Sequence, residues 1–294
     1  MTPIDLSRPV LVLVKKSFYE MYGLEQKDSR FLAMVESNSS AGRDLLVAHE
    51  ENVRTIDAVI SYLESSGIPY VKSVGRQGKI DGRYSLVITV GGDGTLLAAS
   101  RQVLETRVVG INSRPGQSVG YFCAAHRDSF QSVLDEILSG RRESRSLARM
   151  DVHINGFRKS PPVLNDILYS GLNPAATTRY RLAMGAVEEM HRSSGIWVST
   201  SAGSTGGIGA AGGEKVDLSN KQLQYLVREP YKPSGVHYSL DRGFFASGLA
   251  ITNLMPDAMV FVDGTRCSFD VHYGDVIEPR VSAYPLHIFL QSDA

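Results

Sequence analysis

The segment that most constrains the fold is 87–95 (VITVGGDGT), in which an apolar β-branched run leads into three glycines around one aspartate. The run predicts a buried strand, and residues 95–104 predict a helix that follows it. Glycine has no Cβ, so backbone N–H groups can approach an anion closely, and the N-terminus of a helix favours negative charge. The segment therefore predicts a phosphate-binding turn with Asp93 at the carboxyl end of a parallel strand.

Two roles are open for Asp93 at this point. A carboxylate there can accept a proton from a hydroxyl group or hold a Mg²⁺-bound phosphate. It can also simply cap the helix, because Gly and Asp are common turn residues. The Walker A motif is absent, since no Gly-Lys-Ser/Thr follows a glycine four residues earlier.

The first half of the chain alternates strand-like and helix-like segments. Apolar residues recur at helical spacing in 53–63 and again in 130–138. Short apolar runs predict strands at 10–14, 69–74, 86–90 and 107–111. This alternation predicts an α/β domain with a parallel sheet and flanking helices.

The pattern changes near residues 141–145. The later chain holds short runs broken by Gly, Pro, Asn and Asp, which is typical of a β-sandwich or a related layered sheet. Strands are predicted at 151–154, 163–169, 180–184, 195–200, 244–249, 259–262, 267–271 and 286–290. With 294 residues, two cores are expected. We assign 1–145 to the α/β domain, 146–277 to a C-terminal β-rich domain, and 278–294 to a segment that rejoins the first domain.

A second glycine-rich segment spans 199–213 and contains GxGxxG at Gly207, Gly209 and Gly212. A dinucleotide-binding Rossmann unit needs a crossover helix of about a dozen residues. Only nine residues separate Gly213 from Leu223, so such a helix does not fit. Two interpretations remain: a loop whose Ser and Thr hydroxyls and bare backbone line a polar ligand, or a flexible hairpin loop.

The polar pair Asn165-Asp166 interrupts the apolar run 163–169. On an alternating strand, two adjacent polar residues cannot both face solvent. At least one of them is therefore expected to face the core or a site, unless a bulge or turn places it elsewhere.

Composition excludes several classes of function. Thirty-one Lys and Arg balance 31 Asp and Glu, so the basic surface of a nucleic-acid binder is not expected. Cys123 and Cys267 form no CxxC pair and the histidines show no HxxxH or HExxH spacing, so we assign no metal ligands and expect a reducing, cytoplasmic location. The apolar run 9–14 is too short for a membrane span, so no membrane partner is expected.

Taken in order, GGDGT, Asn165-Asp166 and the segment 199–213 resemble the NAD kinase family, as do 110–112, 120–122, 262–264 and 274–277. The resemblance implies an NAD site in a cleft between an α/β domain and a β-rich domain. It also implies transfer of the γ-phosphoryl group of ATP, with Mg²⁺, to the 2′-hydroxyl of the adenosine ribose of NAD. A homo-oligomer, dimer or tetramer, that completes the site from a neighbouring subunit is implied as well.

The resemblance assigns roles residue by residue. Asp93 is implied as the general base, and Asn165 and Asp166 as the pair that binds adenine and the ribose hydroxyls. The other implied dinucleotide- or phosphate-binding residues are Gly91, Gly92, Gly94, Thr95, Asn112, Arg192, Ser194, Ser204, Thr205, Gly206, Gly207 and Ala210.

The chain also departs from the family pattern. Thr205-Gly206-Gly207-Ile208 stands where members often read Thr-Ala-Tyr-Ser, so a ring that packs on the ligand is missing and Gly207→Tyr is expected to tighten NAD binding. Ser194 replaces a frequent aspartate, and Ala176 stands near the position of a basic residue. The sequences at 193–195 (SSG) and 112–115 (NSRP) resemble the mitochondrial-type branch of the family more than the common bacterial one.

Two alternatives to an NAD kinase are weighed. Diacylglycerol- and sphingosine-type lipid kinases share GGDGT, but they typically continue into an Asn-Glu-Val helix, whereas this chain continues into residues 96–99 (LLAA). A non-catalytic dinucleotide-binding protein would not need the base that Asp93 provides. The sequence leaves open whether the donor is ATP, another triphosphate or polyphosphate, and whether the acceptor is NAD or NADH.

Overall fold

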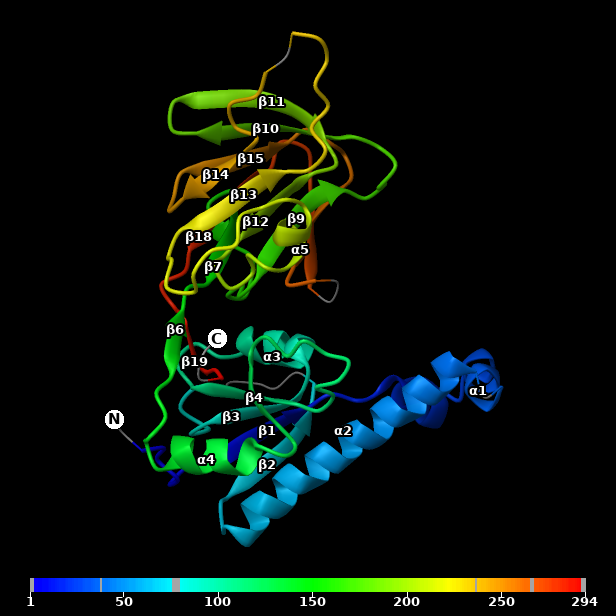
Figure 1. The fold of residues 1–294 in the computed structure, drawn as a ribbon. Helices are drawn as coiled ribbons and strands as arrows, with labels where there is room; N and C mark the ends of the chain where they lie inside the picture. Colours follow the sequence, from blue (N-terminus) through cyan, green and yellow to red (C-terminus); the bar gives the residue numbers. More distant parts are fainter. Residues whose placement is uncertain (1–2, 38, 76–79, 236, 265–266, 292–294) are drawn as a thin grey trace. The chain divides into compact units, whose positions relative to one another are not determined.

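The computed structural model describes residues 3–37, 39–75, 80–235, 237–264 and 267–291. The chain forms two compact units, one of Met1–Arg145 with His287–Ala294 and one of Ser146–Leu286 (Figure 1). The first unit is α/β and the second is rich in antiparallel strands, which confirms the predicted fold class. No helix within these described ranges has both the length and the apolar character to cross a membrane.

The first unit is built on a sheet with strand order β2-β1-β3-β4-β19-β6, with β5 beside β4. Every pairing from β2 through β19 is parallel. The central strands β1, β3 and β4 are buried along their whole length, as expected of a parallel sheet covered on both faces. The strands are β1 (Val10–Val14), β2 (Tyr70–Val74), β3 (Val87–Gly91), β4 (Val108–Asn112), β5 (Cys123–His126), β6 (Arg145–Leu147) and β19 (Leu286–Phe289).

The described part of this unit contains five helical segments. The long helix α2 begins after the N-cap Ser39, whose side chain accepts a hydrogen bond from the Gly42 N–H, and buries Ile56, Val59 and Leu63 in the same core as the sheet. The helix α3 ends at Ser100, short of the predicted residue 104, because the backbone N–H groups that follow donate to the Asp81 carboxylate instead. The segments are η1 (Tyr19–Glu25, a π-helix), α1 (Ser29–Glu36), α2 (Ser40–Ser65), α3 (Asp93–Ser100) and α4 (Phe130–Leu138).

The second unit consists of two six-stranded antiparallel sheets in the part of the chain that the structure describes. One has the order β11-β10-β15-β18-β7-β8 and the other β14-β13-β12-β9-β16-β17. Alternate side chains of both sheets fill one core, so the predicted sandwich is confirmed. Its elements are β7 (Met150–Ile154), β8 (Phe157–Arg158), β9 (Asp166–Gly171), β10 (Thr178–Met184), β11 (Val187–Ser193), β12 (Ile196–Ser199), α5 (Gly207–Ala210), β13 (Leu223–Val227), β14 (Arg242–Phe245), β15 (Leu249–Asn253), β16 (Ala258–Val262), β17 (Ser268–Val271) and β18 (Val276–Val281).

Two boundary predictions in this unit differ from the structure. The predicted strand 244–249 is divided between β14 and β15, because Gly248 has a φ of +85° and turns the chain between them. The segment 278–286 belongs to the second unit, since β18 pairs with β7 and β15. The chain therefore returns to the first unit at His287, not at residue 278.

Candidate active site

In the first unit, the candidate site lies at the turn from β3 to α3. The N-cap of α3 is Gly92, and no side chain caps this helix. The Asp93 carboxylate instead accepts hydrogen bonds from two backbone N–H groups of another loop, those of Tyr121 at 3.0 Å and Phe122 at 2.8 Å. These bonds fix its orientation while each carboxylate oxygen keeps a further lone pair. The helix-cap interpretation of Asp93 is therefore wrong.

The three glycines of the turn meet different surroundings. Gly91 has a φ of +155°, and a Cβ there would overlap the buried Thr95 hydroxyl. A Cβ on Gly92 would come within 2.7 Å of Ser118 Oγ. A Cβ on Gly94, in contrast, would have no atom within 4 Å. The fold therefore favours glycine most strongly at 91, a side chain at 92 would require the Ser118 hydroxyl to turn away, and Gly94 leaves open space beside Asp93.

Asn112 ends β4 directly opposite Gly91 in the sheet register. Its amide donates to the Ser118 carbonyl at 3.1 Å, and its Oδ1 accepts from the Arg114 N–H at 3.0 Å. Gly120, with a φ of +60°, packs so tightly on this amide that a Cβ would overlap it. Asn112 thus holds the loop that carries the N–H groups bound to Asp93, and the ligand contact that the resemblance implies for Asn112 stays a prediction.

In the second unit, the candidate site gathers around the start of β9. Asp166 is only 6% exposed, and the Gly207 N–H donates to its carboxylate. Asp263 bonds to the same segment: its N–H donates to the Asp166 carbonyl at 2.9 Å, and its carboxylate accepts from the Asn165 N–H at 2.8 Å and from the Leu164 N–H at 3.4 Å. Burial and the negative charge of Asp263 raise the pKa of Asp166 to about 7, and the Gly207 N–H opposes this shift.

Asn165 offers a polar atom that nothing in the described part of the chain satisfies. Its side-chain Oδ1 is buried and has no hydrogen-bond partner there. A buried acceptor without a donor is costly, and such atoms are commonly satisfied by a ligand or an ordered water. Asn165 is therefore the strongest candidate in this unit for a direct ligand contact.

The hydroxyl groups of the loop after β12 point into the loop. Thr200 Oγ1 donates to the Leu164 carbonyl, and Ser204 Oγ accepts from the Val216 N–H at 3.1 Å. Ser199 and Ser201 also donate to backbone carbonyl groups, and all four residues are buried. These four hydroxyls thus bond to backbone groups of the protein itself, and the prediction that Ser and Thr hydroxyls of this segment line a ligand stays a prediction. Thr205 and Ala210 are exposed, and Gly206 is half-buried beside the Asp166 carboxylate.

Gly207 faces an aromatic ring that the sequence patterns do not single out. A Cβ on Gly207 would come within 2.8 Å of Cη2 and 2.9 Å of Cζ2 of Trp197, on β12. The space beside Gly207 is thus already filled by an indole. The expectation that Gly207→Tyr adds a stacking ring for NAD is wrong, because the new side chain would collide with Trp197.

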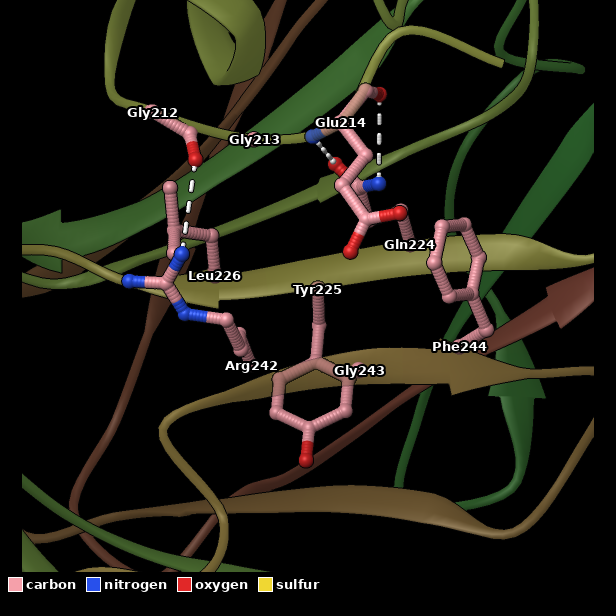
Figure 2. A pocket seen from close by; sticks show the side chains of 9 residues that line it. All are labelled: Gly212, Gly213, Glu214, Gln224, Tyr225, Leu226, Arg242, Gly243 and Phe244. Carbon is pink, nitrogen blue, oxygen red and sulfur yellow. Dashed lines mark hydrogen bonds between the residues drawn. The ribbon is translucent and has the colours of Figure 1, made fainter.

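The end of the same loop is tied to β13 and β14 (Figure 2). The Glu214 N–H donates to Gln224 Oε1 at 3.1 Å, and Gln224 Nε2 donates to the Glu214 carbonyl at 3.2 Å. Arg242 reaches the Gly212 carbonyl at 3.5 Å. These hydrogen bonds anchor the loop. The hollow between the residues has a volume of only about 20 Å³, which leaves no room for a ligand.

Arg192 and Ser194 lie elsewhere in the second unit. The β12–β9 register pairs Ser199 with Asp166, so Ser194, which precedes β12, lies at the far end of the strand pair. Ser194 and Ala176 line a separate cavity of about 330 Å³, and Arg192 is exposed on β11. The structure therefore does not bring these two predicted residues to Asp166 within this unit.

Sequence reasoning gave no role to three features of the site: the backbone N–H groups of 121–122, the carboxylate of Asp263, and the ring of Trp197. Residues 120–122 and 262–264 belong to the pattern that resembles the family, and the dipeptide Asp263-Gly264 is typical of a turn, whereas Trp197 carried no such signal. Groups of three or more His, Cys, Asp or Glu side chains able to hold a metal ion do not occur among the described residues.

Comparison with known proteins places the chain in a family. Residues 12–142 match the family model of the ATP-NAD kinase N-terminal domain. A probable NADH kinase of Oryza sativa subsp. japonica is 34% identical over 229 residues, which cover 70% of each protein. The NADH kinase of Arabidopsis thaliana is also 34% identical over 229 residues, covering 70% of this chain and 72% of the relative.

Two solved structures share the fold. The NAD kinase of Archaeoglobus fulgidus in complex with ATP aligns with a TM-score of 0.68 at 20% identity, covering 96% of this chain and 94% of that one. Yeast NADH kinase complexed with NADH aligns with a TM-score of 0.72 at 14% identity, covering 97% and 84%.

Proposed function

The chain belongs to the NAD kinase family, and on this premise we propose that it transfers the γ-phosphoryl group of ATP to the 2′-hydroxyl of the adenosine ribose of NAD, giving NADP and ADP. The observation that carries the acceptor assignment is the buried, unpartnered Oδ1 of Asn165 next to the buried carboxylate of Asp166. The Asn165 Oδ1 can accept a hydrogen bond from the amino group of adenine, and the Asp166 carboxylate can accept one from a ribose hydroxyl.

Asp93 is the proposed general base. Its carboxylate is oriented by the N–H groups of Tyr121 and Phe122 and keeps lone pairs for an incoming hydroxyl. As the 2′-oxygen forms its bond to the γ-phosphorus, the hydroxyl proton passes to Asp93 and the bond to the β-phosphate oxygen breaks. The bare backbone at Gly94 and the N-terminus of α3 favour the negative charge of the phosphates.

The donor is proposed to enter as its Mg²⁺ complex. Mg²⁺ is usually held by substrate phosphates plus one or two carboxylates rather than by a cage of protein ligands. That preference fits a chain whose described residues offer no cluster of three metal-binding side chains. Bound Mg²⁺ would neutralise charge on the phosphates. Asp93 lies within the glycine turn and is the carboxylate that would contact it.

A coupled assay for NADP formation tests the proposal. NAD, ATP and Mg²⁺ should yield NADP, and parallel reactions with NADH or polyphosphate identify the preferred acceptor and donor. Phosphorylation of diacylglycerol without NADP formation would favour the lipid-kinase alternative. Dinucleotide binding without any turnover would favour the non-catalytic alternative.

A homo-oligomer in a reducing, cytoplasmic compartment is part of the proposal. The edge strand β11 exposes Val187 and Met190, which are 45% and 54% exposed, and exposed strand edges favour pairing. Light scattering at micromolar concentration should give a mass of at least twice 32.1 kDa. A mass of one chain alone would contradict the oligomer and leave the activity untouched.

A further inference from the structure

A cavity of about 290 Å³ lies in the first unit, outside the residues assigned above. It opens where β1 and β2 end and is walled by η1 and α2. We propose that this cavity binds the nucleoside part of the phosphoryl donor, a purine nucleoside triphosphate whose phosphates extend to the glycine turn at Gly91–Gly94. This inference rests on the proposed function and adds the location of the donor.

The sheet register brings the cavity next to the glycine turn. Val14, the last residue of β1, pairs with Val90 of β3 on one side and Val74 of β2 on the other. Lys15, which lines the cavity, therefore follows β1 at the level where Gly91 ends β3. Neighbouring strands are about 4.8 Å apart, so a triphosphate can bridge the two positions. In open α/β sheets, this carboxyl edge is where ligands bind.

The walls of the cavity combine apolar and charged groups. Val14, Val53 and Ile56 supply aliphatic surface that suits the face of a base. The His49 ring is held in place by a 2.8 Å contact of Nδ1 with Ser17 Oγ and by Tyr19 at a centroid distance of 5.2 Å. A base therefore meets a surface that is already ordered.

The charged groups match the rest of a nucleotide. Glu20 and Asp57 offer carboxylate oxygens for ribose hydroxyls, and Lys15, Lys16 and Lys72 surround the opening with positive charge. Lys16 is ion-paired with Glu25, and Lys15 lies over the Phe18 ring at 5.4 Å. Lys72 is exposed and makes no ion pair with any residue that the structure describes, so its charge is available to a phosphate.

The same features argue against two other occupants. Inorganic polyphosphate would use the lysines but would gain nothing from aliphatic walls and would be repelled by Glu20 and Asp57. The acceptor dinucleotide already has its adenosine assigned to Asn165 and Asp166. A nucleoside triphosphate can contact the aliphatic side chains with its base, the carboxylates with its ribose hydroxyls and the lysines with its phosphates.

Calorimetric titration tests the proposal directly, with MgATP, adenosine and inorganic tripolyphosphate as separate probes. Val53→Trp fills the cavity from the exposed side of α2, and Val47→Trp on the same helix is the matched control, because Val47 is exposed but does not line the cavity. Lys72→Glu reverses one charge, and Arg141→Glu, at an exposed position after α4, is its control.

We expect Val53→Trp to raise the Kd for MgATP about tenfold or more and to abolish the binding of adenosine. The Kd for tripolyphosphate should stay unchanged in this variant. Lys72→Glu should weaken MgATP and tripolyphosphate by roughly tenfold each. Both control variants should bind as the wild-type protein does, and the Kd for NAD should stay the same in every variant.

An unchanged Kd for MgATP in a folded Val53→Trp variant would overturn the proposal. If that variant does not fold, acylation of Lys72 in the wild-type protein decides: MgATP should protect Lys72, and full labelling in saturating MgATP would also overturn it. The donor site and the proposed function fail separately. If MgATP binds and the variants change its Kd as expected but no NADP forms, only the kinase activity is rejected. If NADP forms but the cavity variants do not change the Kd for MgATP, only the donor site is rejected.

Discussion

The backbone of Gly207 packs against the indole of Trp197, so closely that a Cβ at 207 would lie 2.8 Å from Cη2. The N–H of the same glycine donates to the Asp166 carboxylate. One backbone position therefore touches both the aromatic ring and the buried acid of the second unit. A side chain at position 207 would therefore disturb the aromatic ring and the hydrogen bond to the buried acid at the same time.

Replacing Gly207 with Tyr should damage the loop. The new side chain must displace Trp197 or pull the Gly207 N–H away from Asp166, and overpacking of this kind costs roughly 1–3 kcal/mol. We expect a lower Tm and a Kd for NAD raised about tenfold or more. Ala211→Tyr, which adds the same ring at an exposed position, is the control and should change neither value much. Tighter NAD binding by Gly207→Tyr would contradict this packing.

Asp93→Asn should reduce kcat for NADP formation by about 10²–10⁴-fold, because an amide cannot accept the hydroxyl proton. Asparagine also keeps only one acceptor for the two N–H groups of Tyr121 and Phe122, so the free energy of unfolding should fall by about 1 kcal/mol. Kinetics and calorimetry separate the two effects, since the Kd for NAD should change little. Asp128→Asn, at an exposed carboxylate of the same unit, is the control. A normal kcat would remove Asp93 from the mechanism.

Gly91→Ala and Gly94→Ala should have opposite signatures. At position 91 the methyl group overlaps the Thr95 hydroxyl, so thermal unfolding should show a clear loss of stability. At position 94 the methyl group meets no protein atom, and alanine is favoured in a helix by about 1 kcal/mol. Gly94→Ala should therefore keep or raise its Tm, and lose about tenfold in kcat/KM if a phosphate approaches this backbone. Unchanged kinetics in Gly94→Ala would show that no ligand approaches this backbone.

Asp166 should make stability depend on pH in an unusual direction. Its pKa is raised from 3.8 to about 7 on folding, so the folded state binds the proton more strongly than the unfolded state. The free energy of unfolding should therefore decrease as the pH rises from about 4 to 7, and stay lowered above that range. Asp166→Asn removes this slope and should stabilise the protein above pH 7 by roughly 4 kcal/mol, since a difference of one in pKa corresponds to about 1.4 kcal/mol.

Thermal unfolding at pH 5 and pH 8 measures this effect. Asp270→Asn, at an exposed position on β17, is the matched control and should leave the pH dependence as it is in the wild-type protein. If Asp166→Asn gains no more stability at pH 8 than at pH 5, the raised pKa of Asp166 is not a property of the folded protein.

Local patterns predict those parts of the molecule whose cause is local. The turn at 91–94 and the buried strand β3 follow from adjacent residues, so the sequence predicts them well. The partners of Asp93 lie 28 and 29 residues away, and Asp263 reaches Asn165 across 98 residues. These contacts depend on the order of the strands and the packing of the loops, which the hydrophobic periodicity of the sequence does not predict. The strand β11 is missed because its mostly exposed residues alternate too weakly to predict a strand.

The placement of β19 beside β4 also sets the order of events during synthesis. Ile288 and Phe289 pair with Val108 and Val109, so a strand from the end of the chain lies inside the sheet formed by its beginning. Domains usually fold as units while the ribosome is still extending the chain. Here the second unit can be completed first, whereas in the first unit Val108 and Val109 of β4 stay without their partner strand until residues 286–289 have been translated. Mutations or stalls late in the message thus threaten the amino-terminal half of the protein.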